Sequence, residues 1–223
     1  MIILAGLMAR KLRGGGVVGG TIGAGTALAL VLLAGSQPTA QSGWQTLFDG
    51  SSLDGWEAIG DANWVLADGT VQADAGSGFL VSEASYGDFD LTVEFWVDPP
   101  SNSGVFIRCG EWRNRWQACI GPAGRRDDTS YEVNVFDTRA DQAYRTGAIV
   151  NVAPAMKTIN AGGRWNTFEI TARGSRLTVV LNGELMVDTD NGQYAEGPIA
   201  LQKGGEPGTV KFRSVRLRRF QDK

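Results

Sequence analysis

The stretch YEVNVFD, residues 131–137, sets the expectation for the whole chain because its side chains alternate between apolar and polar. Val133 and Val135 point to one side of an extended backbone, and Glu132 and Asn134 point to the other. Alternation with a period of two is typical of a β-strand that has one face in a hydrophobic core. Glu and Asn are depleted in strands. They are therefore either ordinary solvated residues or part of a binding surface.

Short segments of the same kind fill the chain from residue 44 onward. Strands are expected at 45–48, 63–66, 70–73, 79–82, 88–98, 105–108, 131–137, 165–172, 177–181, 184–187, 199–202 and 210–220, with 147–152 as a further candidate. Asp68-Gly69 and Asn182-Gly183 favour tight hairpin turns between neighbouring segments. No window of helical length shows a 3.6-residue period. The pattern predicts an all-β fold, an antiparallel jelly-roll sandwich, as one domain over residues 43–223.

The composition narrows the classes of function. A content of 43% hydrophobic and 20% charged residues predicts a folded domain with a sizeable core. The net charge of −3 and the lack of a basic tail argue against nucleic acid as a partner. The sequence has no histidine, which excludes a Ser-His-Asp triad and any zinc site built on imidazole. Acid–base chemistry would have to come from Asp, Glu, Lys, Tyr or Cys.

Residues 1–42 have the pattern of an export signal peptide. Arg10, Lys11 and Arg13 precede the uncharged run 14–35, and small residues suited to signal cleavage follow this run. The run is also long enough to span a bilayer, so an N-terminal membrane anchor is the alternative. In both cases we expect an exported protein, located in the periplasm, in the cell envelope or outside the cell. Membrane contact would then occur only through this segment, if it is not cleaved.

Several motifs, taken in order, resemble the 3-keto-disaccharide hydrolase domain family. They are LFDG at 47–50 with LDGW at 53–56, YGDFDLTVEF at 86–95, NSGVFIR at 102–108, the stretch 131–137, GRWNTFEI at 163–170, LNG at 181–183, and IALQ at 199–202 with VKFR at 210–213. The resemblance is collinear from about residue 43 to 220. It implies a concanavalin A-like jelly roll of two sheets and activity on glycosides that are oxidised at C3 of the sugar.

The resemblance leaves the use of a cofactor open. Some members of the family depend on a metal or on a histidine, and the version that needs a histidine cannot apply to this chain. A divalent metal stays open. The partner that the resemblance implies is a carbohydrate.

In a sandwich, the apolar side chains of each strand face the core and the other set faces outward. The outward set predicted here comprises Glu94 and Trp96, Phe106 and Arg108, Glu132 and Asn134, and Ala200 and Gln202. If these strands share one sheet, they form a charged and amide-rich floor with aromatic rings beside it. Such surfaces bind sugars through hydrogen bonds to hydroxyl groups and through stacking on apolar sugar faces.

The chemistry implied by the resemblance suggests a role for each of these residues. A ketone at C3 acidifies the proton at C2, so a base can remove that proton and expel the anomeric oxygen. Glu132 is the candidate base, with its pKa raised by burial beside Glu94. Arg108 is the candidate donor to the enolate oxygen. Asn134 and Gln202 would position hydroxyl groups of the substrate.

Other interpretations remain open from the sequence. Asp137 alternates to the side opposite to Glu132 and Asn134 and lies at the end of their strand. It is therefore expected at the rim of the site or as a metal ligand. A direct two-carboxylate glycosidase would use Glu132 with Glu94 or Asp137. A module of the same fold that binds a glycan without cleaving it is the main alternative to an enzyme, and the lack of histidine favours it. A structural envelope protein is the third interpretation.

Cys109 and Cys119 are the only two cysteines. In an exported chain such a pair predicts a disulfide, and two reduced core cysteines are the alternative. The bond would stiffen a loop in which Trp112 and Trp116 are candidates for stacking on sugar. The acidic stretches 127–128 and 188–191 have oxygen ligands suited to calcium but no recognisable ligand spacing, which favours solvated turns.

Overall fold

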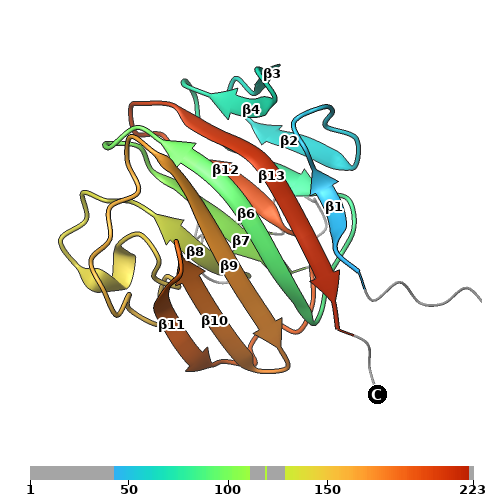
Figure 1. The fold of residues 1–223 in the computed structure, drawn as a ribbon, viewed down its shortest axis with the longest axis vertical. Coiled ribbons are helices and arrows are strands. Elements are labelled where there is room, and N and C mark those ends of the chain that lie inside the picture. Colours follow the sequence, from blue (N-terminus) through green and yellow to red (C-terminus); the bar gives the residue numbers. More distant parts are fainter. Residues whose placement is uncertain (1–42, 111–118, 120–128, 221–223) are drawn as a thin grey trace, which may run out of the picture. The chain divides into compact units, whose positions relative to one another are not determined.

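The computed structural model describes residues 43–110, 119 and 129–220, which form a sandwich of two antiparallel sheets (Figure 1). These ranges contain a 3-10 turn, η3 (Gln142–Tyr144), and no α-helix. None of the described helical residues forms a helix long and apolar enough to cross a membrane. The all-β jelly-roll prediction is confirmed. The segment 1–42, with its predicted signal or anchor, lies outside the described residues and stays a prediction.

The larger sheet has eight strands in the order β11-β10-β9-β6-β13-β4-β3, with β1 also paired to β13. Figure 1 shows its long strands side by side in one layer. The strands are β1 (Gln45–Phe48), β3 (Val65–Ala67), β4 (Thr70–Ala73), β6 (Phe89–Val97), β9 (Trp165–Arg173), β10 (Arg176–Leu181), β11 (Glu184–Asp190) and β13 (Val210–Arg219).

The smaller sheet has five strands in the order β2-β5-β12-β7-β8. They are β2 (Trp56–Gly60), β5 (Gly78–Ser82), β7 (Ser103–Ile107), β8 (Tyr131–Val135) and β12 (Ala200–Lys203). Strands that follow one another in sequence often lie in different sheets, as β5 and β6 or β12 and β13 do. The central pairings are therefore long-range, as in other jelly rolls.

The hydrophobic core lies between the two sheets. Val93 and Phe95 of β6 face it from the larger sheet, and Phe95 stacks on Phe168 of β9 with the ring centroids 4.8 Å apart. Val133 and Val135 of β8 face it from the smaller sheet. The alternation read from the sequence therefore assigned the inward and outward faces of β6 and β8 correctly.

Both predicted hairpin turns are present. Asp68 and Gly69 join β3 to β4 with φ of 51° and 70°, and Asn182 and Gly183 join β10 to β11 with φ of 52° and 83°. Two consecutive positive φ angles are typical of a type I′ turn, and Asp-Gly and Asn-Gly are the residue pairs that favour this turn.

Two segments differ from the prediction. Strand β2 was not predicted, because its WEAIG run is short and contains Ala and Gly, which are poor strand formers. Pairing with β5 holds it in place. The candidate strand 147–152 forms only isolated bridges, from Ile149 to Val133 and to Ala153.

Candidate functional site

A polar cluster surrounds Gly104 on the outward face of the five-stranded sheet. The register places Gln202 of β12 on one side of Gly104 and Asn134 of β8 on the other. Glu132 of β8 pairs with Phe106, one step along the same face. A Cβ atom at position 104 would lie 3.1 Å from Glu132 Oε1 and 3.4 Å from Gln202 Oε1. The absence of a side chain at Gly104 therefore leaves the space in which these two oxygens converge.

The amide groups of this cluster are buried but not satisfied. Gln202 is 0% exposed, Asn134 is 5% exposed and Asn102, two residues before Gly104, is 6% exposed. Among the described residues, four of their atoms lack a hydrogen-bond partner: Oε1 and Nε2 of Gln202 and the Oδ1 atoms of both asparagines. Leaving a buried polar group unpaired costs roughly 1–3 kcal/mol, so such atoms need an explanation. A polyhydroxylated ligand would supply both the donors and the acceptors that they lack.

Glu132 supplies the carboxylate of the site. It is 6% exposed, and Oε1 is the atom directed at the space above Gly104. Asn134 is fixed next to it, because its Nδ2 donates to the carbonyl oxygen of Tyr144 at 2.6 Å. The structure therefore brings together three of the predicted site residues, Glu132, Asn134 and Gln202, on one face.

Much of the rest of this face is apolar, with Glu57 of β2 as a charged exception beside Val81. Ile59, Phe79, Val81, Phe106 and Ala200 form a second hydrophobic cluster with the two cysteines. Phe79 and Phe106 meet edge to face with their centroids 5.2 Å apart. Phe106 is 0% exposed, so it forms part of a covered floor rather than an open stacking surface.

The predicted disulfide is present. Cys109 and Cys119 are bonded, with their Cα atoms 4.7 Å apart, and both are buried against the apolar cluster. The bond holds Cys119 beside Cys109, just after the end of β7. Trp112 and Trp116, the predicted stacking residues between the cysteines, lie outside the described residues.

Arg108 does not join the site, which corrects its predicted role as the enolate donor. Its φ of +51° ends the alternation of β7, so the side chain leaves the outward face. The guanidinium is buried and donates to the carbonyl oxygens of Gly87, Gly174 and Tyr194 and to Oδ1 of Asp88. Burial lowers the pKa of Arg108, and the Asp88 carboxylate opposes this shift. Arg108 thus connects the end of the smaller sheet to the larger one.

Glu94 and Trp96 also lie elsewhere, because β6 belongs to the eight-stranded sheet. Both side chains face outward as predicted, but from the opposite side of the sandwich. Glu94 forms an ion pair with Arg213, and Lys211 lies over the Trp96 ring at 5.3 Å. Glu94 therefore lies on a different sheet from Glu132, and the two do not form the predicted carboxylate pair.

Asp137, predicted at the rim of the site or as a metal ligand, is hydrogen-bonded within the fold. Its carboxylate accepts hydrogen bonds from Thr146 Oγ1 and from the backbone N–H groups of Ala161 and Gly162. These bonds hold the segment after β8 against the residues before β9. With its oxygens used in this way, Asp137 is a structural residue.

The side chains available as ligands limit which metal ions could bind. Within the described ranges, no three acidic or Cys side chains come together as ligands. Asp188 and Asp190 belong to β11 rather than to a turn, and Arg176 pairs with both. The Gly104 cluster itself offers only oxygen ligands, namely the Glu132 carboxylate and three amide oxygens. Such a set fits Ca²⁺ or Mg²⁺ and does not fit zinc.

Sequence reasoning missed Asn102 and Gly104. Both lie just before the predicted strand 105–108, outside its bounds. They share the parity of Phe106, so extending the alternation backward by two steps would have placed both on the outward face. The space at Gly104 itself depends on neighbours from β8 and β12, which the alternation of one strand does not reveal.

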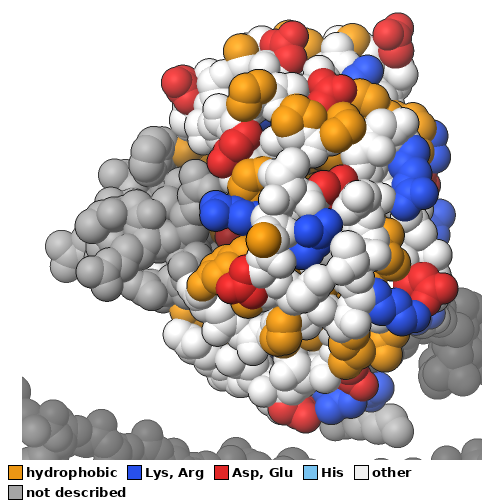
Figure 2. Space-filling view, turned by 90° about the vertical axis from the view of Figure 1, so that its left-hand side faces the viewer, with side chains coloured by type: hydrophobic (Ala, Val, Ile, Leu, Met, Phe, Trp, Pro, Cys, Tyr) orange, Lys and Arg blue, Asp and Glu red, His pale blue; other side chains and the backbone are white. Residues whose placement is uncertain are grey.

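The surface charge on one side of the molecule is of mixed sign. Figure 2 shows Lys and Arg side chains interspersed with Asp and Glu on the face that it presents. A surface of this kind produces no extended field of one sign over that face.

Comparison with known proteins identifies the family. A family model described as the 3-keto-alpha-glucoside-1,2-lyase-like domain matches residues 43–218. The chain belongs to this family. The resemblance inferred from the motifs is thereby confirmed, and the family is carbohydrate-active and glycosyl hydrolase-like.

This chain is similar to proteins of known sequence and of known structure. A 3-keto-disaccharide hydrolase from Bacteroides thetaiotaomicron is 28% identical over 87 residues, which cover 33% of this chain and 30% of that protein. A solved "putative glycosyl hydrolase" from Parabacteroides distasonis is 19% identical, with a TM-score of 0.67 over 80% of this chain and 94% of that one. The carbohydrate binding module CBM66 from Bacillus subtilis is 18% identical, with a TM-score of 0.54 over 73% and 94%. The two solved structures show the fold alone.

Proposed function

We propose that the Gly104 cluster binds a glycoside that carries a ketone at C3 of the sugar, and that Glu132 is the base that starts its cleavage. One observation carries this proposal: buried amide atoms without described partners surround a carboxylate on one sheet face. A ligand rich in hydroxyl groups would satisfy the amides. Membership of a 3-keto-glucoside lyase-like family supports the choice of ligand.

The reaction is an elimination across C1 and C2. Glu132 takes the C2 proton, which the C3 ketone makes acidic, and the electron pair passes into the ketone to form an enolate. The enolate then expels the glycosidic oxygen from C1, and this leaving oxygen takes up the proton that Glu132 holds, which returns Glu132 to the carboxylate. The products are an unsaturated keto sugar and the free alcohol. Addition of water to the double bond in a second step would give net hydrolysis.

The amides replace Arg108 in this scheme. Gln202 Nε2 is buried and lacks a described partner, so it is the donor placed to stabilise the enolate oxygen. Asn102 and Asn134 would accept hydrogen bonds from the sugar hydroxyls through Oδ1. A divalent cation, if it binds, would be held by Glu132 and the three amide oxygens, and it would polarise the ketone.

Glycan binding without cleavage is the second candidate function. The amide atoms would hold hydroxyl groups equally well in a binding module, and the fold is similar to that of CBM66. For either function we propose an exported protein. The disulfide in the structure supports this, because such bonds persist in oxidising compartments.

The test uses para-nitrophenyl 3-keto-α-glucopyranoside, with nitrophenol release to follow turnover and calorimetry to follow binding. Glu132→Gln should lower turnover at least roughly a hundredfold, the range for loss of a general base. Binding should stay within about threefold, since the change keeps the shape of the side chain. Glu94→Gln, on the other sheet, is the matched control and should leave turnover unchanged.

The possible outcomes separate the candidates. Undiminished turnover in Glu132→Gln would end the assignment of the base. Binding without turnover by the wild-type chain would decide for the binding module. If the wild-type chain neither binds nor cleaves this compound, the Gly104 cluster is not a 3-keto-glycoside site.

A further inference from the structure

A second set of aromatic and polar side chains lies on the outward face of the eight-stranded sheet. The strand register places five residues in one row across β3, β4, β13, β6 and β9: Val65, Gln72, Lys211, Trp96 and Trp165. Neighbouring strands are ~4.8 Å apart, so the row spans roughly 19 Å. Val65 is 50% exposed and the other four are partly exposed. The row is therefore accessible from solvent along its length.

The two tryptophans are held in position by cations. Trp96 and Trp165 are direct neighbours on β6 and β9. Lys211 Nζ lies 5.3 Å from the Trp96 ring, and the Arg213 guanidinium lies 4.3 Å from the Trp165 ring. Glu94 pairs with Arg213 and keeps it there. Each ring is thus next to a cation from β13, and the register places the two tryptophans side by side on neighbouring strands.

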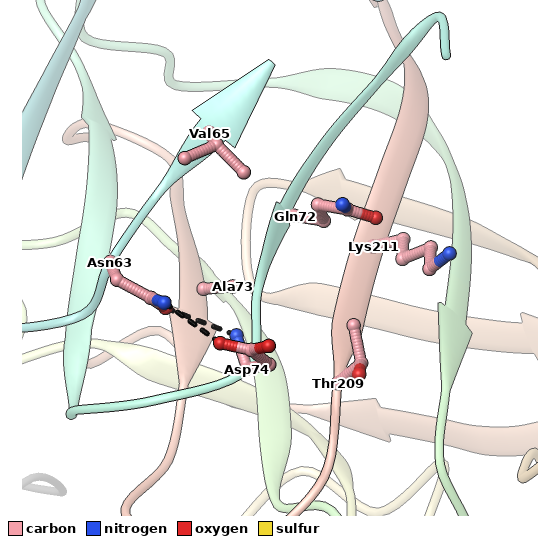
Figure 3. Close-up of a pocket in the computed structure, with 7 residues that line it drawn as sticks. All are labelled: Asn63, Val65, Gln72, Ala73, Asp74, Thr209 and Lys211. Carbon is pink, nitrogen blue, oxygen red and sulfur yellow. Dashed lines mark hydrogen bonds between the residues drawn. The ribbon is translucent and has the colours of Figure 1, made fainter. Parts of the chain in front are cut away.

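A polar pocket continues the row at its β3–β4 end. It is lined by Val65, Gln72 and Lys211 of the row, together with Asn63, Asp74 and Thr209. Figure 3 shows Asn63 and Asp74 pointing toward each other and the Gln72 amide extending toward β13, from which Lys211 projects. Asn63 Nδ2 donates to Asp74 Oδ1 at 2.7 Å, which fixes the carboxylate.

The pocket offers both donors and acceptors to a ligand. Within the described part of the chain, no hydrogen bond engages the Gln72 amide or the Lys211 ammonium. Lys211 and Arg213 are balanced by Asp74 and Glu94, so the surface does not select a ligand by charge. Paired hydroxyl groups can donate to a carboxylate and accept from an ammonium or an amide, while the apolar face of a sugar ring stacks on tryptophan.

We propose that this row and its pocket bind an extended neutral glycan, on the side of the sandwich opposite to the Gly104 cluster. The length of the row favours an oligosaccharide or polysaccharide over a monosaccharide. The mixed charges and the aromatic surface favour a neutral sugar polymer. The proposal does not depend on the catalytic role of Glu132, because the two surfaces belong to different sheets.

Affinity electrophoresis of the full chain tests the proposal. Native gels would contain dextran, laminarin or hydroxyethyl cellulose, three soluble neutral polysaccharides. At least one should retard the wild-type chain. Trp96→Ala and Gln72→Ala should each raise the apparent Kd for that polymer about tenfold, which corresponds to ~1.4 kcal/mol. Gln72 makes no side-chain hydrogen bond to a described residue, so its variant should fold even if Trp96→Ala does not.

Two control variants complete the test. Trp44 is 41% exposed and lies beside Arg216 and Arg218 at the other end of the same sheet. Trp44→Ala and Glu132→Gln should be retarded like wild type. The proposal is overturned if no polymer retards the wild-type chain, or if Gln72→Ala binds as tightly as wild type. Loss of retardation in Trp44→Ala or Glu132→Gln would place the binding elsewhere and would overturn it as well.

Discussion

The two outward faces of the sandwich carry similar side chains in opposite surroundings. Around Gly104, the amides and the carboxylate are at most 6% exposed, whereas Gln72, Lys211, Trp96 and Trp165 remain accessible to solvent. A buried polar atom without a partner costs the fold free energy, but an exposed one bonds to water. The Gly104 cluster is therefore identified by the free-energy cost of its unpaired buried atoms. The row that contains Trp96 and Trp165 is identified by the arrangement of its rings and pocket. Substitutions should show this difference as a difference in magnitude.

Arg108→Ala should have the largest effect on stability. The change removes a guanidinium that is 0% exposed, takes its N–H donors from three carbonyl oxygens and leaves Asp88 with the N–H of Gly174. We expect the free energy of unfolding in urea to fall by about 3 kcal/mol or more. Arg219→Ala, which removes an exposed guanidinium, should cost under ~0.5 kcal/mol. Full stability combined with lost turnover in Arg108→Ala would restore the catalytic role predicted from the sequence.

Gln202→Met should separate stability from binding on the Gly104 face. The amide is fully buried and both of its polar atoms lack described partners, so an apolar side chain of similar size removes a penalty. The free energy of unfolding should rise by about 1 kcal/mol, while binding of the 3-keto-glycoside should weaken at least tenfold. Denaturation and calorimetry measure the two quantities. A loss of stability would show that the free protein already satisfies this amide.

The smallest effect is expected on the exposed face, for the pair Glu94 and Arg213. Their side chains are 31% and 46% exposed, so solvent screens the attraction. A double-mutant cycle with Glu94→Gln and Arg213→Gln should give a coupling free energy below ~1 kcal/mol. This coupling should decrease further in 0.5 M salt. A coupling as large as the effect of Arg108→Ala would remove the contrast between the two faces.

The sequence predicted part of the candidate Gly104 cluster but not which other strands lie beside it. Alternation placed Glu132, Asn134 and Gln202 on one outward face, and all three meet at Gly104. The same reasoning placed Glu94 on the outward side of its strand but could not assign that strand to a sheet. Parity is a local property of one strand, whereas sheet membership depends on pairing between distant segments.

Arg108 and Asp137 show two further cases in which alternation along a strand does not predict the contacts of a side chain. Alternation fails at Arg108 because its backbone turns into the left-handed region, and nothing in the NSGVFIR run signals this. Asp137 was placed by parity at the end of its strand, but its partners Ala161 and Gly162 lie more than twenty residues further along the chain. Their role as partners became visible only in the folded chain.

The sequence by itself determined the all-β class, the two hairpin turns, the disulfide pair and the outward side of strands such as β6 and β8. These features depend on residues close together in the chain or, for the disulfide, on the only two cysteines present. The tertiary structure alone decided which strands share a sheet, that Gly104 leaves space between Glu132 and Gln202, and that Trp96 joins Trp165 on the opposite face. These depend on long-range strand pairing, which a period of two in a single strand does not encode.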